Sequence, residues 1–139
     1  MNELPIQEFV PHRPPLLLLD AIEDVSESSC RTRLRVDPGA WYADAEGTMP
    51  AWLGLELMAQ TAAAHSGWKH RNSPSPKGGV LLGTRRYQSS VDRFPAGATL
   101  EIEAQLDYAG VFGQSAFVCQ IRLNETVVAE ATLRVLETP

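Results

Sequence analysis

The only long helical pattern in this 139-residue chain carries a single acidic residue, Glu56. The pattern covers residues 48–68 and is apolar almost all the way round, so the helix must be enclosed by the rest of the domain. Gln60 follows Glu56 by one helical turn and lies on the same side. A charge in apolar surroundings is costly unless it is paired or neutralised. We therefore interpret Glu56 as a functional acid; the alternative is a structural glutamate tied to a backbone group or a neighbouring subunit.

Six predicted strands accompany this helix. They cover residues 16–25, 30–36, 80–91, 100–108, 115–123 and 127–136. The clearest alternation places Cys30, Thr32, Leu34 and Val36 on one face and three arginines on the other. The connections between the last four strands are too short for parallel crossovers, which indicates antiparallel pairing.

The order of these elements predicts an α+β fold. The economical arrangement is one domain, residues 1–139, in which a curved antiparallel sheet wraps around the central helix. Pro50 is expected near the first helical position and Gly67 at the helix stop. The two open edges of such a sheet invite pairing with a second copy of the chain.

Composition excludes several classes of protein. The net charge of −5 argues against nucleic-acid binding. No run approaches the roughly 18 apolar residues of a membrane span. Residues 1–9 lack the basic start and apolar core of a signal peptide, so we expect a cytoplasmic protein. Cys30 and Cys119 are expected to be buried thiols, with a disulfide as the alternative. No Cys and His spacing indicates a metal site, and no cofactor is expected.

Three segments of the chain resemble one enzyme family. VPHRPPLLLLDAIEDV (residues 10–25) is similar to the opening segment of the β-hydroxyacyl-(acyl carrier protein) dehydratases, and MPAWLGLELMAQTAAAHSG (residues 49–67) is similar to their central helix. GGVLLGTRRYQSSVDRFPAGATLEIEAQL (residues 78–106) resembles the strands that follow. The resemblance is strongest to the branch found in aryl-polyene and related type II polyketide gene clusters. It implies the hotdog fold and puts Glu56 at the position of the catalytic glutamate.

The chain departs from the family at the catalytic histidine. In the fatty-acid dehydratases this histidine lies fourteen residues before the glutamate, in a GHFPG loop, and the matching position here is Tyr42. Three interpretations stay open. His12 supplies the imidazole from the PHR segment, Tyr42 substitutes in an altered site, or the subunit is inactive and supports a catalytic partner chain.

The resemblance implies dehydration of a 3-hydroxyacyl thioester to a trans-2-enoyl thioester. The reaction needs a base at C2, an acid for the departing hydroxyl and hydrogen-bond donors for the thioester oxygen. Burial would favour the neutral form of Glu56, which suits the acid. His12 is the candidate base, and the alternative is that its imidazole fixes the Pro-rich turn. The backbone N–H groups of Ala51 and Trp52, at the helix N-terminus, are expected to hold the thioester oxygen.

The remaining candidates would bind the substrate or its carrier. Arg85 and Arg86 lie in a segment, residues 57–91, that holds five cations and no acid, and they are expected to contact the phosphopantetheine phosphate or the acyl carrier protein. The alternative is a salt bridge to the chain's own acids. Trp41, Tyr42 and Trp52 could line an acyl tunnel or belong to plain core or dimer contacts. Gln60 is expected to contact the substrate beside Glu56.

Three functions are therefore compared. The first is a homodimeric or heterodimeric hotdog dehydratase that acts on an acyl chain held by an acyl carrier protein. The second is a hotdog thioesterase, in which Glu56 activates water against the thioester. The third is a scaffold subunit that stabilises a true dehydratase. Of the two remaining histidines, His65 is expected to be a satisfied core residue and His70 to be solvated.

Overall fold

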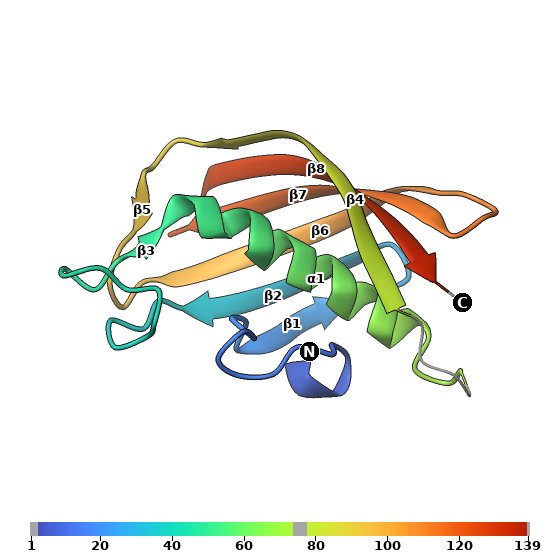
Figure 1. Ribbon diagram of the computed structural model, residues 1–139, viewed down its shortest axis with the longest axis horizontal. Helices are drawn as coiled ribbons and strands as arrows, with labels where there is room; N and C mark the ends of the chain where they lie inside the picture. The colour runs from blue at the N-terminus through green and yellow to red at the C-terminus, as the bar shows by residue number, and fades with distance from the viewer. Residues whose placement is uncertain (1–2, 74–77, 139) are drawn as a thin grey trace.

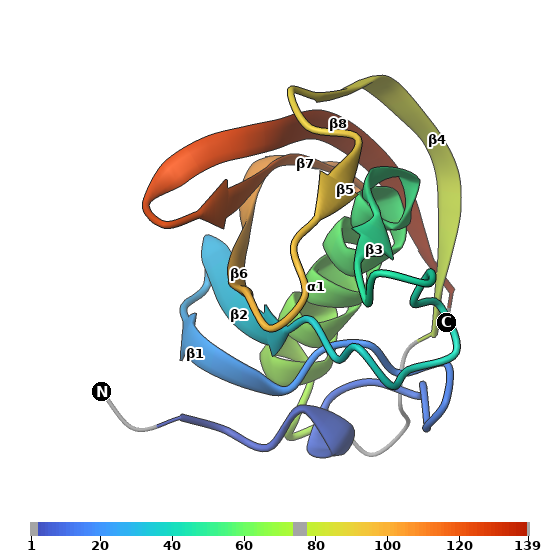
Figure 2. The same cartoon turned by 90° about the vertical axis from the view of Figure 1, so that its left-hand side faces the viewer.

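The computed structural model describes residues 3–73 and 78–138. Six strands form one antiparallel sheet in the order β1-β2-β6-β7-β8-β4, and one helix, α1, packs against it (Figure 1). The strands are β1 (Ala21–Val25), β2 (Ser29–Arg35), β4 (Gly78–Ser89), β6 (Thr99–Ala109), β7 (Gln114–Leu123) and β8 (Thr126–Thr138). Figure 2 shows the sheet curling around α1, which confirms the predicted α+β architecture. Within the described residues, no helix is long and apolar enough to cross a membrane.

The helix α1 spans Gly54–Lys69 and follows a 3-10 turn at Ala51–Leu53. Its start is therefore later than the predicted start near Pro50. The prediction that Gly67 ends the helix is wrong. A Cβ atom at Gly67 would lie 1.9 Å from the carbonyl oxygen of Phe9, so glycine is needed there for the close approach of the N-terminal segment.

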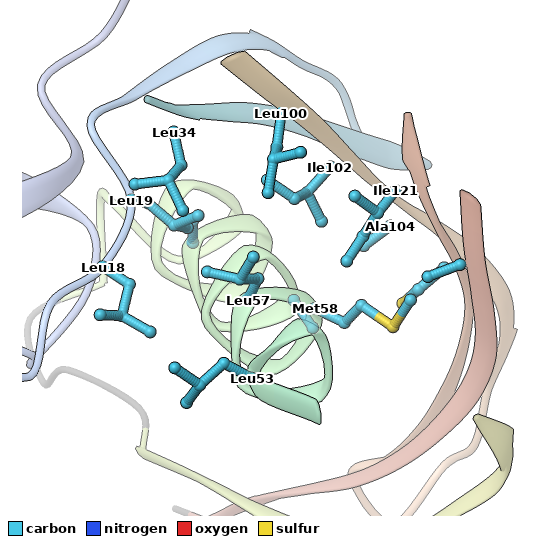
Figure 3. Close-up of a cluster of buried hydrophobic side chains, with 14 of the residues drawn as sticks. Leu18, Leu19, Leu34, Leu53, Leu57, Met58, Leu100, Ile102, Ala104 and Ile121 are labelled. Atoms are coloured by element: carbon cyan, nitrogen blue, oxygen red, sulfur yellow. The ribbon is translucent and has the colours of Figure 1, made fainter. Parts of the chain in front are cut away.

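The core lies between α1 and the concave face of the sheet. Leu57 and Met58 of the helix and Leu100 and Ile102 of β6 are completely buried in one cluster (Figure 3). Full burial of a side chain of this size contributes about 1.5–3 kcal/mol to folding. This burial explains why the apolar helix carries no broad polar face.

The first strand is shorter than predicted. Residues 16–20 are not in a strand, although they are as apolar as the rest of the predicted segment. The backbone carbonyl of Leu16 and the backbone N–H of Leu18 are bonded instead to the side chain of Gln60, at 2.8 and 3.0 Å. The segment therefore packs against the helix and joins the sheet only at Ala21.

Two short strands, β3 (Met49–Pro50) and β5 (Arg93–Phe94), form a second sheet beside the start of α1 (Figure 2). Met49 pairs with Phe94, and both side chains are fully buried. Strands of two residues leave no periodic pattern in a sequence, so this pair was not predicted.

The two edges of the main sheet differ. The β1 edge is partly covered, because the backbone of Ile22 exchanges two hydrogen bonds with Leu4, at 2.9 and 3.1 Å. On the other side, β4 pairs only with β8 among the described strands. The β4 edge is thus open for a further strand.

Both cysteines are buried free thiols, as predicted. Cys30 of β2 and Cys119 of β7 both pair with Ala104 of β6, from opposite sides. Two strand spacings of about 4.8 Å each separate their backbones. A disulfide needs Cα atoms within about 7 Å, so the alternative of a bridge is wrong.

Candidate active site

Glu56 and His12 face one another from different segments of the chain. Nε2 of His12 lies 3.9 Å from Oε1 of Glu56. Glu56 is in the first turn of α1, and His12 belongs to the Pro-rich segment, residues 11–15. The distance exceeds a hydrogen bond, but catalytic pairs in unliganded enzymes are often this loose and tighten around the substrate. An acid and an imidazole therefore share one location, as the base hypothesis for His12 requires.

The imidazole of His12 does not fix the Pro-rich turn. Its Nδ1 atom is buried and has no hydrogen-bond partner among the described residues. The guanidinium of Arg13 donates instead to the backbone carbonyls of Val10 and His12, at 2.8 and 2.7 Å. A buried polar atom without a partner costs about 1–3 kcal/mol. The structural alternative for His12 is therefore wrong, because Arg13 bonds the turn and His12 leaves a ring nitrogen unused.

The side chain of Glu56 is 47% exposed, and that of His12 is 29% exposed. The expectation that the Glu56 carboxyl is buried is thus wrong for the single chain. The residue lies on the less buried face of α1, together with the half-buried Leu55, Ala59 and Ala63. Burial at Glu56 requires something else to cover this face.

Gln60 holds Glu56 in place. Its amide nitrogen donates to Oε1 of Glu56 at 3.1 Å and to the carbonyl of Leu16 at 2.8 Å, and its amide oxygen accepts the N–H of Leu18 at 3.0 Å. The side chain is completely buried. Both amide hydrogens already have acceptors in the chain, so Gln60 positions the Glu56 carboxylate. The prediction that Gln60 contacts the substrate is therefore wrong.

A cavity of about 260 Å³ runs along the exposed face of α1. Glu56 and His12 line one part of it, and small helix side chains, Ala59, Ala62 and Ala63, line the next part. The opposite wall comes from the sheet: Leu81 of β4, Ser115 and Phe117 of β7, and Val135 of β8. The cavity is mostly apolar and opens onto an acid–base pair, which suits a hydrocarbon chain that ends in a reactive polar group.

One of the two predicted donors for the thioester oxygen is already occupied. The N–H of Ala51 donates to the carbonyl of Asp92 at 3.0 Å, because β3 and β5 pair immediately before it. Ala51 also accepts a hydrogen bond from the hydroxyl of Tyr87 at its own carbonyl. The assignment of Ala51 is therefore wrong. Trp52 is 69% exposed and does not line the cavity.

Two other candidates, Tyr42 and Arg86, lie away from this cavity. Tyr42 lines a separate hollow with Trp41 and accepts a hydrogen bond from the N–H of Asp37 at 3.0 Å; burial raises the pKa of its phenol. Arg86 is exposed on β4, outside the cavity. Arg85 is also in β4, but its side chain lies outside the described part of the structure.

Sequence reasoning missed a second polar group in the cavity. Glu137 of β8 lines it at the end away from Glu56 and accepts hydrogen bonds from Ser66 and His70 of the α1 region, at 3.1 and 2.9 Å. The prediction that His70 is solvated is thus wrong. Contact between a helix end and the last strand leaves no signal in local sequence spacing.

The remaining histidine, His65, is part of the core. It is 2% exposed, its Nε2 donates to the carbonyl of Glu27 at 2.9 Å, and its ring packs edge-on against Phe117. Burial lowers its pKa. Among the residues that the structure describes, no group of three His, Cys, Asp or Glu side chains is placed to hold a metal ion.

Comparison with solved structures defines the class. The chain is similar to the dehydratase heterocomplex ApeI:P from Xenorhabdus doucetiae, with a TM-score of 0.91 and 25% identity over 99% of this chain and 93% of that one. A hypothetical thioesterase with coenzyme A from Streptococcus pneumoniae matches with a TM-score of 0.67 and 15% identity, over 84% of each chain. This chain is also similar to the phenylacetic acid degradation protein PaaI from Thermus thermophilus, with a TM-score of 0.64 and 18% identity over 86% of this chain and 93% of that one. The curved sheet around one helix is the hotdog fold that these proteins share.

The family is narrower than the fold. The model of the ApeP-like family, described as ApeP dehydratase, matches residues 4–139, so the chain belongs to the ApeP-like dehydratases. No curated protein matches the sequence significantly.

Proposed function

We propose that this chain dehydrates 3-hydroxyacyl thioesters carried by an acyl carrier protein and forms trans-2-enoyl thioesters. The observation that carries the proposal is the pairing of Glu56 with His12 beside a mostly apolar cavity. Membership of a dehydratase family supports the reaction type. The reaction would belong to fatty-acid or polyketide-type biosynthesis.

Each residue of the pair takes one half of the proton transfer. Nε2 of His12 removes a proton from C2 of the substrate, while protonated Glu56 donates to the hydroxyl on C3. The C3–O bond breaks, the C2–C3 double bond forms, and the hydroxyl leaves as water. The C2 proton is then on His12, and exchange with solvent returns the pair to its starting state. Gln60 keeps the Glu56 carboxylate aimed at the cavity throughout.

The proposal includes a second hotdog chain, identical or different. The open edge of β4 provides the pairing surface, and Leu81 of this strand is 43% exposed while it lines the cavity. A chain paired there would cover the cavity and the exposed Glu56. It would also supply the donor for the thioester oxygen that Ala51 does not provide. The similarity of this chain to ApeI:P, which is a heterocomplex, supports a partner of this kind.

Arg86, on the exposed part of β4, and Arg85 beside it are proposed to contact the acidic surface of the carrier protein or the phosphate of its arm. Trp52, which is exposed beside the start of α1, and Tyr42 are proposed contacts of the acyl chain or of the partner chain. These assignments depend on the assembled dimer and not on the single chain.

Mass spectrometry separates the proposed functions. Incubation of the purified protein, alone and with a copurifying hotdog subunit, with a 3-hydroxyacyl carrier protein is expected to give a product lighter by one water. Release of a free carrier thiol would instead identify a thioesterase, in which Glu56 activates water. Neither product, together with tight binding of a second hotdog chain, would identify a scaffold subunit.

A further inference from the structure

The cavity contains a second carboxylate, Glu137, which the proposed reaction does not use. Its Oε1 accepts the hydroxyl of Ser66 at 3.1 Å, and its Oε2 lies 2.9 Å from Nε2 of His70. The side chains of Glu137 and His70 are 20% and 25% exposed. Two side chains from the end of α1 therefore hold this carboxylate in one orientation beside the cavity.

The carboxylate is not needed to attach the end of β8. The backbone of Glu137 is already held, because its N–H donates to the carbonyl of Gly113 at 2.9 Å and it pairs with Gly79 in β4. A carboxylate has about four acceptor positions, and Ser66 and His70 occupy one on each oxygen. Acceptor capacity is left toward the cavity that Glu137 lines.

The position of Glu137 relative to Glu56 fixes what it can contact. Ser66, its hydrogen-bond partner, follows Glu56 by ten residues of α1, which at 1.5 Å per residue is about 15 Å along the helix. Between the two carboxylates the cavity is lined by Ala59, Ala62 and Ala63, which offer no polar side-chain atom. Along its helix wall the cavity therefore has a carboxylate at each end and apolar side chains between them.

We propose that Glu137, held by Ser66 and His70, accepts a hydrogen bond from a donor group of the substrate, a hydroxyl or an amide N–H, about 15 Å from the thioester carbon. The inference rests on the proposed function, because it takes the thioester to lie at Glu56. Two parts of the substrate carry such donors: the pantetheine arm, through its amides, and the acyl chain, if its far end bears a hydroxyl.

Calorimetry with thioether analogues, which do not react, tests this without relying on turnover. Three analogues are compared: a full pantetheine arm with a methyl-ended chain, the same arm with a hydroxyl-ended chain, and a short N-acetylcysteamine arm with the methyl-ended chain. The variants are Glu137→Leu and, as the control, Glu130→Leu. Glu130 is exposed on the same strand, outside the cavity, and has its own partner in Gln120.

If the acyl end supplies the donor, the wild type binds the hydroxyl-ended analogue about tenfold tighter than the methyl-ended one, and Glu137→Leu removes this difference. If the pantetheine arm supplies the donor, the wild type binds the full-arm analogue more tightly than the short-arm analogue. Glu137→Leu then makes this ratio of affinities about tenfold smaller. Glu130→Leu leaves both differences as in the wild type. The inference is overturned if Glu137→Leu also leaves both unchanged.

Should Glu137→Leu fail to fold, Glu137→Gln replaces it, since glutamine keeps the shape and one acceptor oxygen. Glu137→Gln is expected to make the Glu137-dependent ratio of affinities between the analogues smaller by about threefold or more, because the neutral amide oxygen is the weaker acceptor. The two proposals fail separately. If the protein does not dehydrate the substrate but Glu137→Leu changes the affinity differences between the analogues, only the proposed function is overturned. If the protein dehydrates the substrate and Glu137→Leu leaves those differences unchanged, only this inference is overturned.

Discussion

The amide of Gln60 donates a hydrogen bond to the carboxylate of Glu56 at 3.1 Å while the same buried side chain holds the backbone at Leu16 and Leu18. These two backbone groups follow directly on the Pro-rich segment that carries His12. Gln60 therefore fixes both the Glu56 carboxylate on the helix and the segment next to His12. The geometry of the pair depends on this clamp more than on any direct contact between its members.

Replacing Gln60 by leucine is expected to lower kcat/KM by about tenfold to a hundredfold, because small misplacements of catalytic groups have effects of this size. The free energy of unfolding should fall by about 1–3 kcal/mol, since Leu16 and Leu18 lose their partner. Steady-state kinetics and urea denaturation measure the two effects.

The matched control for Gln60→Leu is Thr61→Val. Thr61 is equally buried in the next position of α1, but its hydroxyl bonds Thr32 at 2.8 Å, away from the cavity. The Thr61→Val variant should lose about as much stability as Gln60→Leu but keep its activity. Equal kinetic losses in the two variants would show that Gln60 acts only through stability.

Gly67→Ala tests the close approach of the N-terminal segment to α1. Helix propensity alone would make the substitution stabilising by about 1 kcal/mol. The new Cβ would lie 1.9 Å from the carbonyl oxygen of Phe9, so we expect a loss of at least about 1 kcal/mol in the free energy of unfolding.

Gly39→Ala is the control for Gly67→Ala, because its Cβ would make only an ordinary contact, at 3.4 Å from Asp37. Urea denaturation of both variants measures the difference. A Gly67→Ala protein as stable as the wild type would mean that residue 9 does not pack against the helix as described.

The burial of His65 predicts a pH dependence of stability. Burial lowers its pKa in the folded state, so the unfolded chain, with a histidine pKa near 6.5, takes up the proton more readily. Stability is therefore full above about pH 6.5 and falls as the pH is lowered below it. Between pH 7.5 and 5.5 the wild type should therefore lose more stability than His65→Phe.

Chemical denaturation of both proteins at the two pH values checks the His65 prediction. The carboxylates of the chain titrate in both proteins, so the comparison isolates the imidazole. Equal losses would show that His65 does not resist protonation in the folded state.

Both cysteines should be inert in the folded protein. Burial raises the pKa of Cys30 and of Cys119 to about 12, which leaves almost no thiolate at neutral pH. Neither thiol is expected to react with Ellman's reagent under native conditions, whereas both should react in urea. A thiol that reacts rapidly in the native protein would contradict the described packing of β2 or β7.

The periodic parts of this fold could be predicted from the sequence, and the contacts across it could not. Glu56 was found because it is the only acid in an apolar helix. The inward row of β2, including Cys30 and Leu34, follows from alternation alone. The hydrogen bonds of Gln60 hold residues 16–18 against the helix, so the first strand is shorter than predicted. The hydrogen bond between Ser66 and Glu137 joins residues that are far apart in the sequence. Neither contact leaves a local sequence pattern.

The donors for the thioester oxygen show a different limit of sequence reasoning. A helix start predicts free N–H groups, but the short strand pair β3 and β5 occupies that of Ala51. The imidazole was predicted only as one of three open interpretations, because Pro-rich segments have no period from which their position can be inferred. The structure favours His12 by placing it 3.9 Å from Glu56 and by leaving its Nδ1 without a partner among the described residues.

The central claim, that His12 and Glu56 work as one base and acid pair, is tested most directly by single-turnover dehydration of a 3-hydroxyacyl carrier protein. His12→Gln and Glu56→Gln should each slow the reaction by about a hundredfold or more, and the double variant should be little slower than the worse single variant, because the two groups act as a unit. Unfolding in urea should show that all three variants are folded. Full turnover in either single variant would contradict the claim.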